Sequence, residues 1–176
     1  MSDSAMSRPS APARLVGSAE RQMQPTSRGA TDKPVIGWRE WIGLPDLGAA
    51  WVKAKVDTGA KSSSLHAWDI HVDEASGDVG FNLYPLQDDE SVVIAATAPL
   101  VDHREVRSSN GEVESRPIIR TTALVLGRPL EIELSLTSRD EMGFRMLLGR
   151  SAVRRRFVVD PGRSFVGGGD RFSRPS

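Results

Sequence analysis

From residue 35 onward, hydrophobic side chains recur at every second position in short runs, which is the period of a β-strand. The clearest run covers residues 130–137, where leucine and isoleucine alternate with Glu131, Glu133, Ser135 and Thr137. This alternation predicts a strand with one buried face and one solvent-facing face. Shorter patterns of the same kind predict strands at residues 35–42, 51–56, 65–72, 81–84, 91–96, 101–108, 112–120, 121–126, 144–148 and 158–160.

Turn signals separate these strands. Pro45 and Gly48 mark a turn at residues 44–48, and Gly127-Arg128 marks a hairpin. Residues 150–157 form the one convincing helical stretch, and its cationic last turn suits the negative end of a helix dipole. Many short strands with a single helix predict an all-β fold, a closed β-barrel with one short C-terminal helix.

The two ends of the chain differ from the middle in composition. Residues 1–33 are rich in Ser, Ala, Arg and Pro and carry few large apolar side chains, so they cannot offset the entropy of ordering. We predict a disordered tail at 1–33, one domain at 34–160, and a flexible Gly- and Arg-rich tail at 161–176.

Charge and cysteine content exclude several classes of function. The 23 basic residues balance the 23 acidic ones, so the composition implies no bulk attraction to DNA or to anionic membranes. The absence of cysteine excludes thiol catalysis and thiolate metal sites. No apolar run approaches the length of a membrane span, and no signal peptide is recognisable at the start. We therefore expect a cytoplasmic protein.

The strongest candidate for chemistry is the tetrapeptide Asp57-Thr58-Gly59-Ala60, which follows the predicted strand 51–56 directly. A carboxylate at the end of a rigid strand is held firmly and points outward, as a catalytic group requires. Gly59 allows a backbone or ligand to come close, and Thr58 adds a hydroxyl with a restricted rotamer. Alone, the same residues also describe an ordinary turn after a strand.

A second stretch favours the catalytic interpretation. Residues 144–150 form an apolar run that ends in Gly149-Arg150. Retroviral-type aspartic peptidases carry the same ordered pair of motifs. Residues 35–160 resemble, more narrowly, a bacterial family of small proteins traditionally called "ATP-dependent zinc protease" and more recently retropepsin-like aspartic endopeptidase. The resemblance rests on Val35–Trp41, Leu44-Pro45, Ala54–Ala60, Ser64–Ala67, Arg116–Ile119 and Met146–Arg150.

The resemblance implies a retropepsin-like barrel in which Asp57 is the catalytic carboxylate. An aspartic peptidase needs two carboxylates that share a proton, and this chain has a single Asp-Thr-Gly triplet, at residues 57–59. The second Asp57 must then come from another copy across a two-fold axis, which makes the enzyme a homodimer. In the family, Thr58 would hydrogen-bond across that axis and Gly149 would leave room beneath the loop.

Two positions depart from the wider pattern. Pepsin-like enzymes place Ser or Thr at Ala60, where its hydroxyl stabilises the ionised aspartate, so Ala60 favours a working range nearer neutral pH. Arg150 resembles an arginine that pairs with an acidic residue after the catalytic triplet. Here that region reads Lys61-Ser62-Ser63, and the usual partner is missing.

The dipeptide Asn110-Gly111, between two extended runs, is a strong hairpin signal. We interpret it as the flap that closes over a bound peptide, with Ala60, Asn110 and Gly111 as candidate substrate contacts. An ordinary surface hairpin is the alternative.

No metal or cofactor is predicted. The chain lacks His-Glu-x-x-His and any phosphate-binding glycine loop, and it contains three histidines, His66, His71 and His103. We interpret His66 as a structural hydrogen-bonding residue near the active-site loop. A metal site built from His66 and carboxylates stays open as an alternative.

Three functional readings therefore remain: an aspartic endopeptidase, a dimeric retropepsin-like adaptor that does not cleave, and a metal-dependent peptidase. The resemblance also implies association with an ATP-grasp ligase that adds glutamates to a ribosomal protein. A glutamylated substrate would suit the cationic Lys61, Arg150 and Arg154–Arg156, whereas the acidic stretch 69–90 would repel it. Alternatively, the three arginines only complete the helix.

Overall fold

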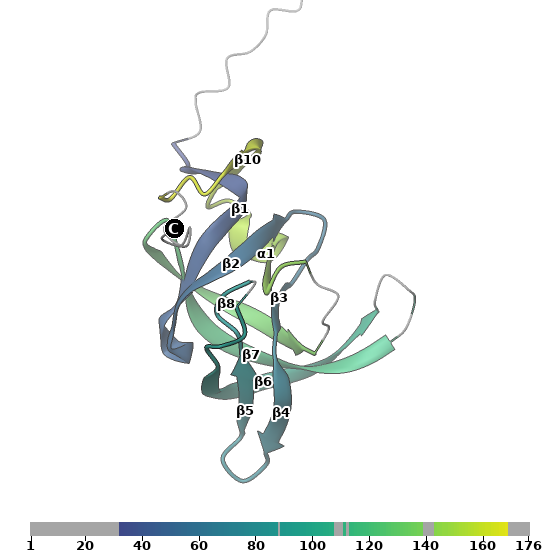
Figure 1. Ribbon diagram of the computed structural model, residues 1–176. Coiled ribbons are helices and arrows are strands. Elements are labelled where there is room, and N and C mark those ends of the chain that lie inside the picture. The colour runs from purple at the N-terminus through teal and green to yellow at the C-terminus, as the bar shows by residue number, and fades with distance from the viewer. Residues whose placement is uncertain (1–31, 88, 108–110, 112, 139–142, 169–176) are drawn as a thin grey trace, which may run out of the picture. The chain divides into compact units, whose positions relative to one another are not determined.

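A computed structural model describes residues 32–168 apart from 88, 108–110, 112 and 139–142. Ten strands, a short 3-10 helix and a short α-helix make up this part of the chain (Figure 1). In chain order they are β1 (Val35–Leu44), η1 (Pro45–Leu47), β2 (Ala49–Asp57), β3 (Ser63–His66), β4 (Trp68–Asp73), β5 (Asp78–Leu83), β6 (Ile94–Arg107), β7 (Val113–Val125), β8 (Arg128–Thr137), β9 (Met146–Gly149), α1 (Arg150–Val153) and β10 (Val158–Ser164).

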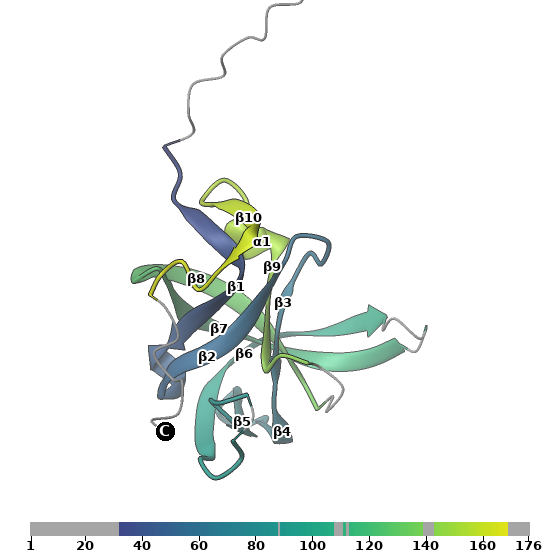
Figure 2. The same cartoon turned by 45° about the horizontal axis from the view of Figure 1, so that its top comes forward.

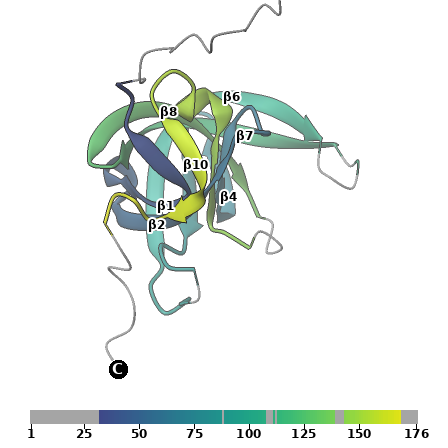
Figure 3. The same ribbon diagram turned by 90° about the horizontal axis from the view of Figure 1, so that it is seen from above.

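Six of these strands close into a barrel, which confirms the predicted fold class. They follow one another in the order β1-β2-β9-β3-β8-β7, and the end of β1 then pairs with β7 through Ile42 and Val125 to close the ring. Outside the ring, β10 lies parallel to β1 (Figure 3), and β6, β5 and β4 extend the sheet beyond β7. Closure leaves the barrel strands without free edges and fixes the strand that carries Asp57 on both sides.

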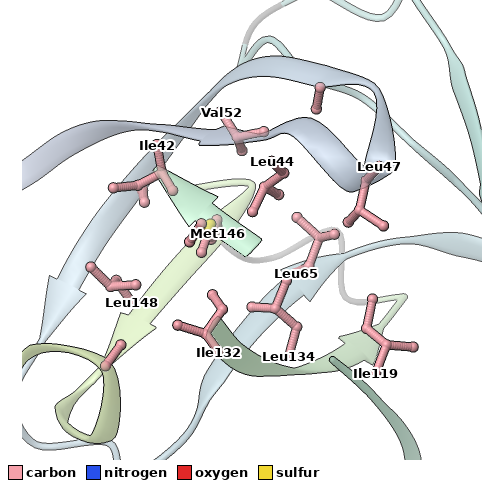
Figure 4. Packing of buried hydrophobic residues seen from close by; sticks show 14 of the residues in the cluster. Ile42, Leu44, Leu47, Val52, Leu65, Ile119, Ile132, Leu134, Met146 and Leu148 are labelled. Atoms are coloured by element: carbon pink, nitrogen blue, oxygen red, sulfur yellow. The ribbon is translucent and has the colours of Figure 1, made fainter. Parts of the chain in front are cut away.

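The barrel is filled by aliphatic side chains from every second position of its strands (Figure 4). Met146 and Leu148 of β9 lie at its centre together with Leu65 and Leu134, and all four are at most 1% exposed. Because side chains alternate along a strand, the residues next to these inward positions lie on the outer face of the barrel. Asp57, which follows the buried Val56 on β2, is one of them.

Several predicted elements are wrong in extent, and in each case a change of pairing partner explains the error. The strand predicted at 65–72 is split into β3 and β4 around Ala67, because β3 pairs with β8 and β9 whereas β4 pairs with β5. Conversely, the two strands predicted at 91–96 and 101–108 are a single strand, β6. It pairs with β5 up to Pro99 and with β7 from Leu100 onward. The strands predicted at 112–120 and 121–126 are likewise one continuous strand, β7, which the structure describes from Val113 to Val125.

The predicted solvent face of β8 is wrong for its second half. Ser135 is 5% exposed and Thr137 is 1% exposed, whereas Glu131 is exposed as expected. Ser135 is buried because its hydroxyl donates to the carbonyl oxygen of Ser63 on the adjacent β3. A polar side chain that finds a partner on the neighbouring strand can be buried without penalty, which the alternation alone does not reveal.

The C-terminal elements also differ from the prediction. α1 ends at Val153, four residues before the predicted end, because Arg154 is extended and Arg155 has a φ of 67°. β10 continues to Ser164 and not to residue 160. The residues after β10 contact β1, where the buried carboxylate of Glu40 accepts hydrogen bonds from the backbone N–H of Val166 and of Gly167.

Candidate active site

The carboxylate of Asp57 stands at the end of β2, on the outer face of the barrel, and is half-buried. Its Oδ1 accepts hydrogen bonds from the backbone N–H of Gly59 at 3.0 Å and of Ala60 at 3.1 Å. Within the described part of the chain both of its hydrogen bonds fall on Oδ1, so Oδ2 stays open to a water molecule. Two backbone donors hold the carboxylate in one orientation, as a catalytic group requires.

Gly59 is required here for space and not for a left-handed backbone. Its φ is not in the positive range, but a Cβ at this position would lie 3.2 Å from Oδ1 of Asp57. The side chain of Thr58 is exposed beside it. Its predicted hydrogen bond across a dimer axis stays a prediction.

β9 passes directly beneath this loop. It pairs in parallel with β2, with Asp57 opposite Gly149, and antiparallel with β3. A Cβ at Gly149 would lie 2.3 Å from the carbonyl oxygen of Ser62, so only glycine fits there without moving backbone. The N–H of Gly149 donates to Oγ of Ser63 at 3.0 Å, which ties β9 to the segment that follows the loop.

Arg150 also holds the loop at residues 57–60, through three of its carbonyl oxygens. Its Nη1 donates to the carbonyl oxygen of Thr58 at 3.0 Å and to that of Gly59 at 3.4 Å, and its backbone N–H donates to Ala60. The loop carbonyls therefore take the place of the acidic partner that residues 61–63 lack. Gly149 and Arg150 are thus brought together with Asp57, Thr58, Gly59 and Ala60.

His66 lies in another environment. It is 3% exposed at the end of β3, with its ring centroid 6.2 Å from that of Trp68, and its backbone N–H donates to the carbonyl oxygen of Arg145. Among the residues that the structure describes, no three His, Asp or Glu side chains converge on one point.

The candidate flap is a long hairpin that projects from the barrel (Figures 1 and 2). β6 and β7 pair out to Arg107 and Val113, which confirms a hairpin at this point of the chain. Gly111 has a φ of 88° and no neighbouring atoms within 4 Å of its Cβ position. Asn110 lies outside the described residues.

A groove of about 440 Å³ adjoins the catalytic loop, and the sequence did not reveal it. Its lining includes Lys61, Ser62 and Arg156, and from β6 and β8 it includes Arg104, Glu131 and Glu133. Arg104 and Glu133 form an ion pair of 2.7 Å, and hydrogen bonding from Arg104 lowers the pKa of Glu133. Arg104 lies on β6 and Glu133 lies on β8, so only the tertiary fold brings them together, and no local sequence pattern could have identified them.

Lys61 and Arg156 are the cations of this groove that form no ion pair within the described residues. Arg156 folds back over α1, where Nη1 donates to the carbonyl oxygens of Ser151 and Ala152. Arg154 and Arg155 are exposed and do not line the groove. The groove therefore holds two cations without an ion-pair partner in the described residues, together with the carboxylates of Glu131 and Glu133, and Lys61 connects it to the loop that follows Asp57.

Comparison with known proteins places the chain clearly. The family model described as retropepsin-like aspartic endopeptidase RimB matches residues 35–168. Curated relatives named "Probable alpha-L-glutamate ligase" include one from Shewanella halifaxensis, 42% identical over 136 residues, and one from Parasynechococcus marenigrum, 46% identical over 134 residues. These alignments cover 76% and 74% of this chain but 30% and 28% of the relatives, so the chain spans under a third of their length.

A solved structure supports the same fold. The crystal structure of Lpg0085 from Legionella pneumophila, a protein of unknown function, superimposes with a TM-score of 0.65 at 26% identity. The similarity covers 76% of this chain and 98% of the Legionella chain. Separately, no helix in the described part of the chain is long and apolar enough to cross a membrane.

Proposed function

Because the chain belongs to the RimB-like family of retropepsin-like aspartic endopeptidases, we propose that it hydrolyses peptide bonds with a pair of Asp57 carboxylates. One observation carries the proposal. The Asp57 carboxylate is oriented by two loop N–H groups, is supported by β9, and lies on the outer face of a closed barrel. Each chain supplies one such carboxylate, so the catalytic pair forms between two copies across a two-fold axis.

The chemistry follows from the proximity of two like charges. Two adjacent carboxylates cannot both ionise, so the pair shares one proton. The ionised Asp57 removes a proton from water, and the water oxygen attacks the scissile carbonyl carbon. The protonated Asp57 donates its proton to the carbonyl oxygen. As the C–N bond breaks, the protonated carboxyl donates its proton to the leaving amine, and the other carboxylate takes a proton from a hydroxyl of the tetrahedral intermediate, so that the pair again shares one proton.

Peptidase activity is expected to survive chelators, because the proposed step uses carboxylates and water alone. A fluorogenic peptide assay in the presence and absence of EDTA tests this against the metal-dependent alternative. Unchanged turnover supports the aspartic mechanism. Loss of turnover in EDTA, with recovery on adding zinc, would contradict it.

For the substrate, we propose a cytoplasmic protein that carries added glutamates, processed in association with a glutamate ligase. Two observations support this. The curated relatives are named probable glutamate ligases, and most of their length lies outside the region that matches this chain. In addition, the groove beside Asp57 offers Lys61 and Arg156 to an anionic group.

Reversing the charge of Arg156 is expected to weaken processing of a glutamate-rich peptide about tenfold, since the groove would then repel carboxylates. Arg156→Glu should leave kcat/KM for a neutral peptide of equal length nearly unchanged. Arg155→Glu is the matched control, because Arg155 is exposed outside the groove. The effect should fade as salt is raised. An equal loss for both peptides would show that Arg156 acts only by completing α1.

A further inference from the structure

The outer face of the barrel next to Asp57 is polar and buried. On β2, β9, β3 and β8 the inward residues belong to the core, so the residues between them share the outer face with Asp57. Paired residues on adjacent strands lie side by side, and the strand register therefore orders this face into rows. One row passes from Thr137 on β8 through His66 on β3 to Arg145, the residue that directly precedes β9. Arg116 extends it on β7, because Arg116 is two residues before Ile118, the register partner of Ser135.

Of the arginines at the two ends of this row, Arg116 is buried and Arg145 is partly buried, whereas their counter-ions are more exposed. The Arg145 side chain is 12% exposed and pairs at 3.1 Å with Glu90, which is 66% exposed. The Arg116 side chain is 8% exposed and pairs at 2.9 Å with Glu114, which is 43% exposed. An ion pair with a solvated carboxylate is weak, so another carboxylate can displace it at little cost.

Arg145 is held in place by more than its counter-ion. Its guanidinium lies 4.9 Å from the centroid of the Tyr84 ring, and its backbone N–H donates to Oε1 of Gln87. Tyr84 in turn stacks on Trp68 with centroids 4.0 Å apart. The cation is therefore oriented before any ligand arrives, which reduces the entropy lost on binding.

Two polar atoms of the row lack a partner among the residues that the structure describes. They are Nε of Arg145 and Oγ1 of Thr137, and Thr137 is 1% exposed. A buried donor without an acceptor is destabilising unless a water molecule or a ligand completes it. Both atoms can donate to the same kind of group, an anionic oxygen.

We propose that Arg145 and Thr137 form a subsite for a carboxylate of the peptide substrate, and that Glu90 forms an ion pair with Arg145 until substrate binds. This inference rests on the proposed function and adds the residues that determine specificity away from the groove at Lys61. Arg145 directly precedes β9 and is four residues before Gly149, the register partner of Asp57, which corresponds to about 13 Å of extended chain. Since an extended peptide advances about 3.3 Å per residue, the recognised side chain lies up to about four residues from the scissile bond.

The test measures binding, so that it stands apart from catalysis. In the full-length Asp57→Asn protein, fluorescence anisotropy follows labelled decapeptides in which a single Glu or Gln occupies successive positions of a neutral sequence. One position is expected to show a Glu preference. Arg145→Met should weaken binding of the Glu peptide about tenfold and leave the affinity for the Gln peptide unchanged. Glu90→Gln should strengthen binding of the Glu peptide about two- to fivefold, because the Glu90 carboxylate no longer competes for Arg145.

Two further variants separate this subsite from a structural role. Glu74→Gln removes an exposed carboxylate from the same acidic stretch and is expected to change neither peptide. Arg145→Lys retains the charge and should keep part of the Glu preference, with folding checked by thermal unfolding. If the Arg145 and Glu90 variants change the affinity for both peptides equally, or if no position prefers Glu, then Arg145 and Thr137 do not bind a substrate carboxylate and the inference is wrong. Hydrolysis of the neutral peptide by the unaltered protein would in that case still support the proposed function.

Discussion

Asp57→Asn is expected to lower kcat about 10²- to 10⁴-fold, while the fold and the oligomeric state stay unchanged. Asparagine can accept the two loop hydrogen bonds at Oδ1, but it cannot take a proton from water. Steady-state kinetics on a fluorogenic peptide, with circular dichroism and sedimentation as checks, measure this.

The matched control is Asp32→Asn, which changes the same chemical group at an exposed position before β1. It should retain full activity. A protein that binds peptide but shows no turnover even with Asp57 intact would instead be the non-cleaving adaptor. Turnover that persists in Asp57→Asn would place the chemistry elsewhere.

Gly149→Ala is expected to destabilise the protein by about 2–4 kcal/mol and to lower activity by more than about a hundredfold. The added Cβ would lie 2.3 Å from the carbonyl oxygen of Ser62, so β9 or the segment after the catalytic loop has to move. Either movement displaces Asp57, whose register partner is Gly149. Urea unfolding and kinetics measure the two effects.

Gly143→Ala is the control for this substitution, because no atom of the residues that the structure describes lies within 4 Å of its Cβ position. It should change stability by less than about 0.5 kcal/mol. If Gly149→Ala behaved like this control, the close contact between β9 and the loop would not exist in solution.

The sequence predicts the barrel and the catalytic loop for physical reasons that are local. Alternation marks most strands, and Asp57-Thr58-Gly59 follows a strand whose apolar face is unmistakable. What local patterns cannot predict is where a strand changes partner. β6 looks like two strands because Pro99 interrupts its pattern, although the chain only passes there from β5 to β7.

The residues of the candidate site likewise fall into those that the sequence predicts and those that only the structure reveals. Asp57 and Gly149 are recognisable because each has a chemical or steric reason to be that residue type. Arg145 and Glu90, and likewise Arg104 and Glu133, are ordinary charged residues in the sequence and meet only through tertiary pairing. The sequence marks Arg150 by its resemblance to a retropepsin arginine and shows that the usual acidic partner is missing, but it does not reveal that the guanidinium donates to the carbonyl oxygens of Thr58 and Gly59.

The central claim is that one active site requires Asp57 from two copies of the chain. It is tested most directly by mixing the unaltered protein with Asp57→Asn protein at fixed total concentration, after subunits have exchanged. Because only dimers with two intact carboxylates are active, turnover should fall as the square of the unaltered fraction, to about a quarter at an equal mixture. A linear fall, to about a half, would show that each chain acts alone and would contradict the claim.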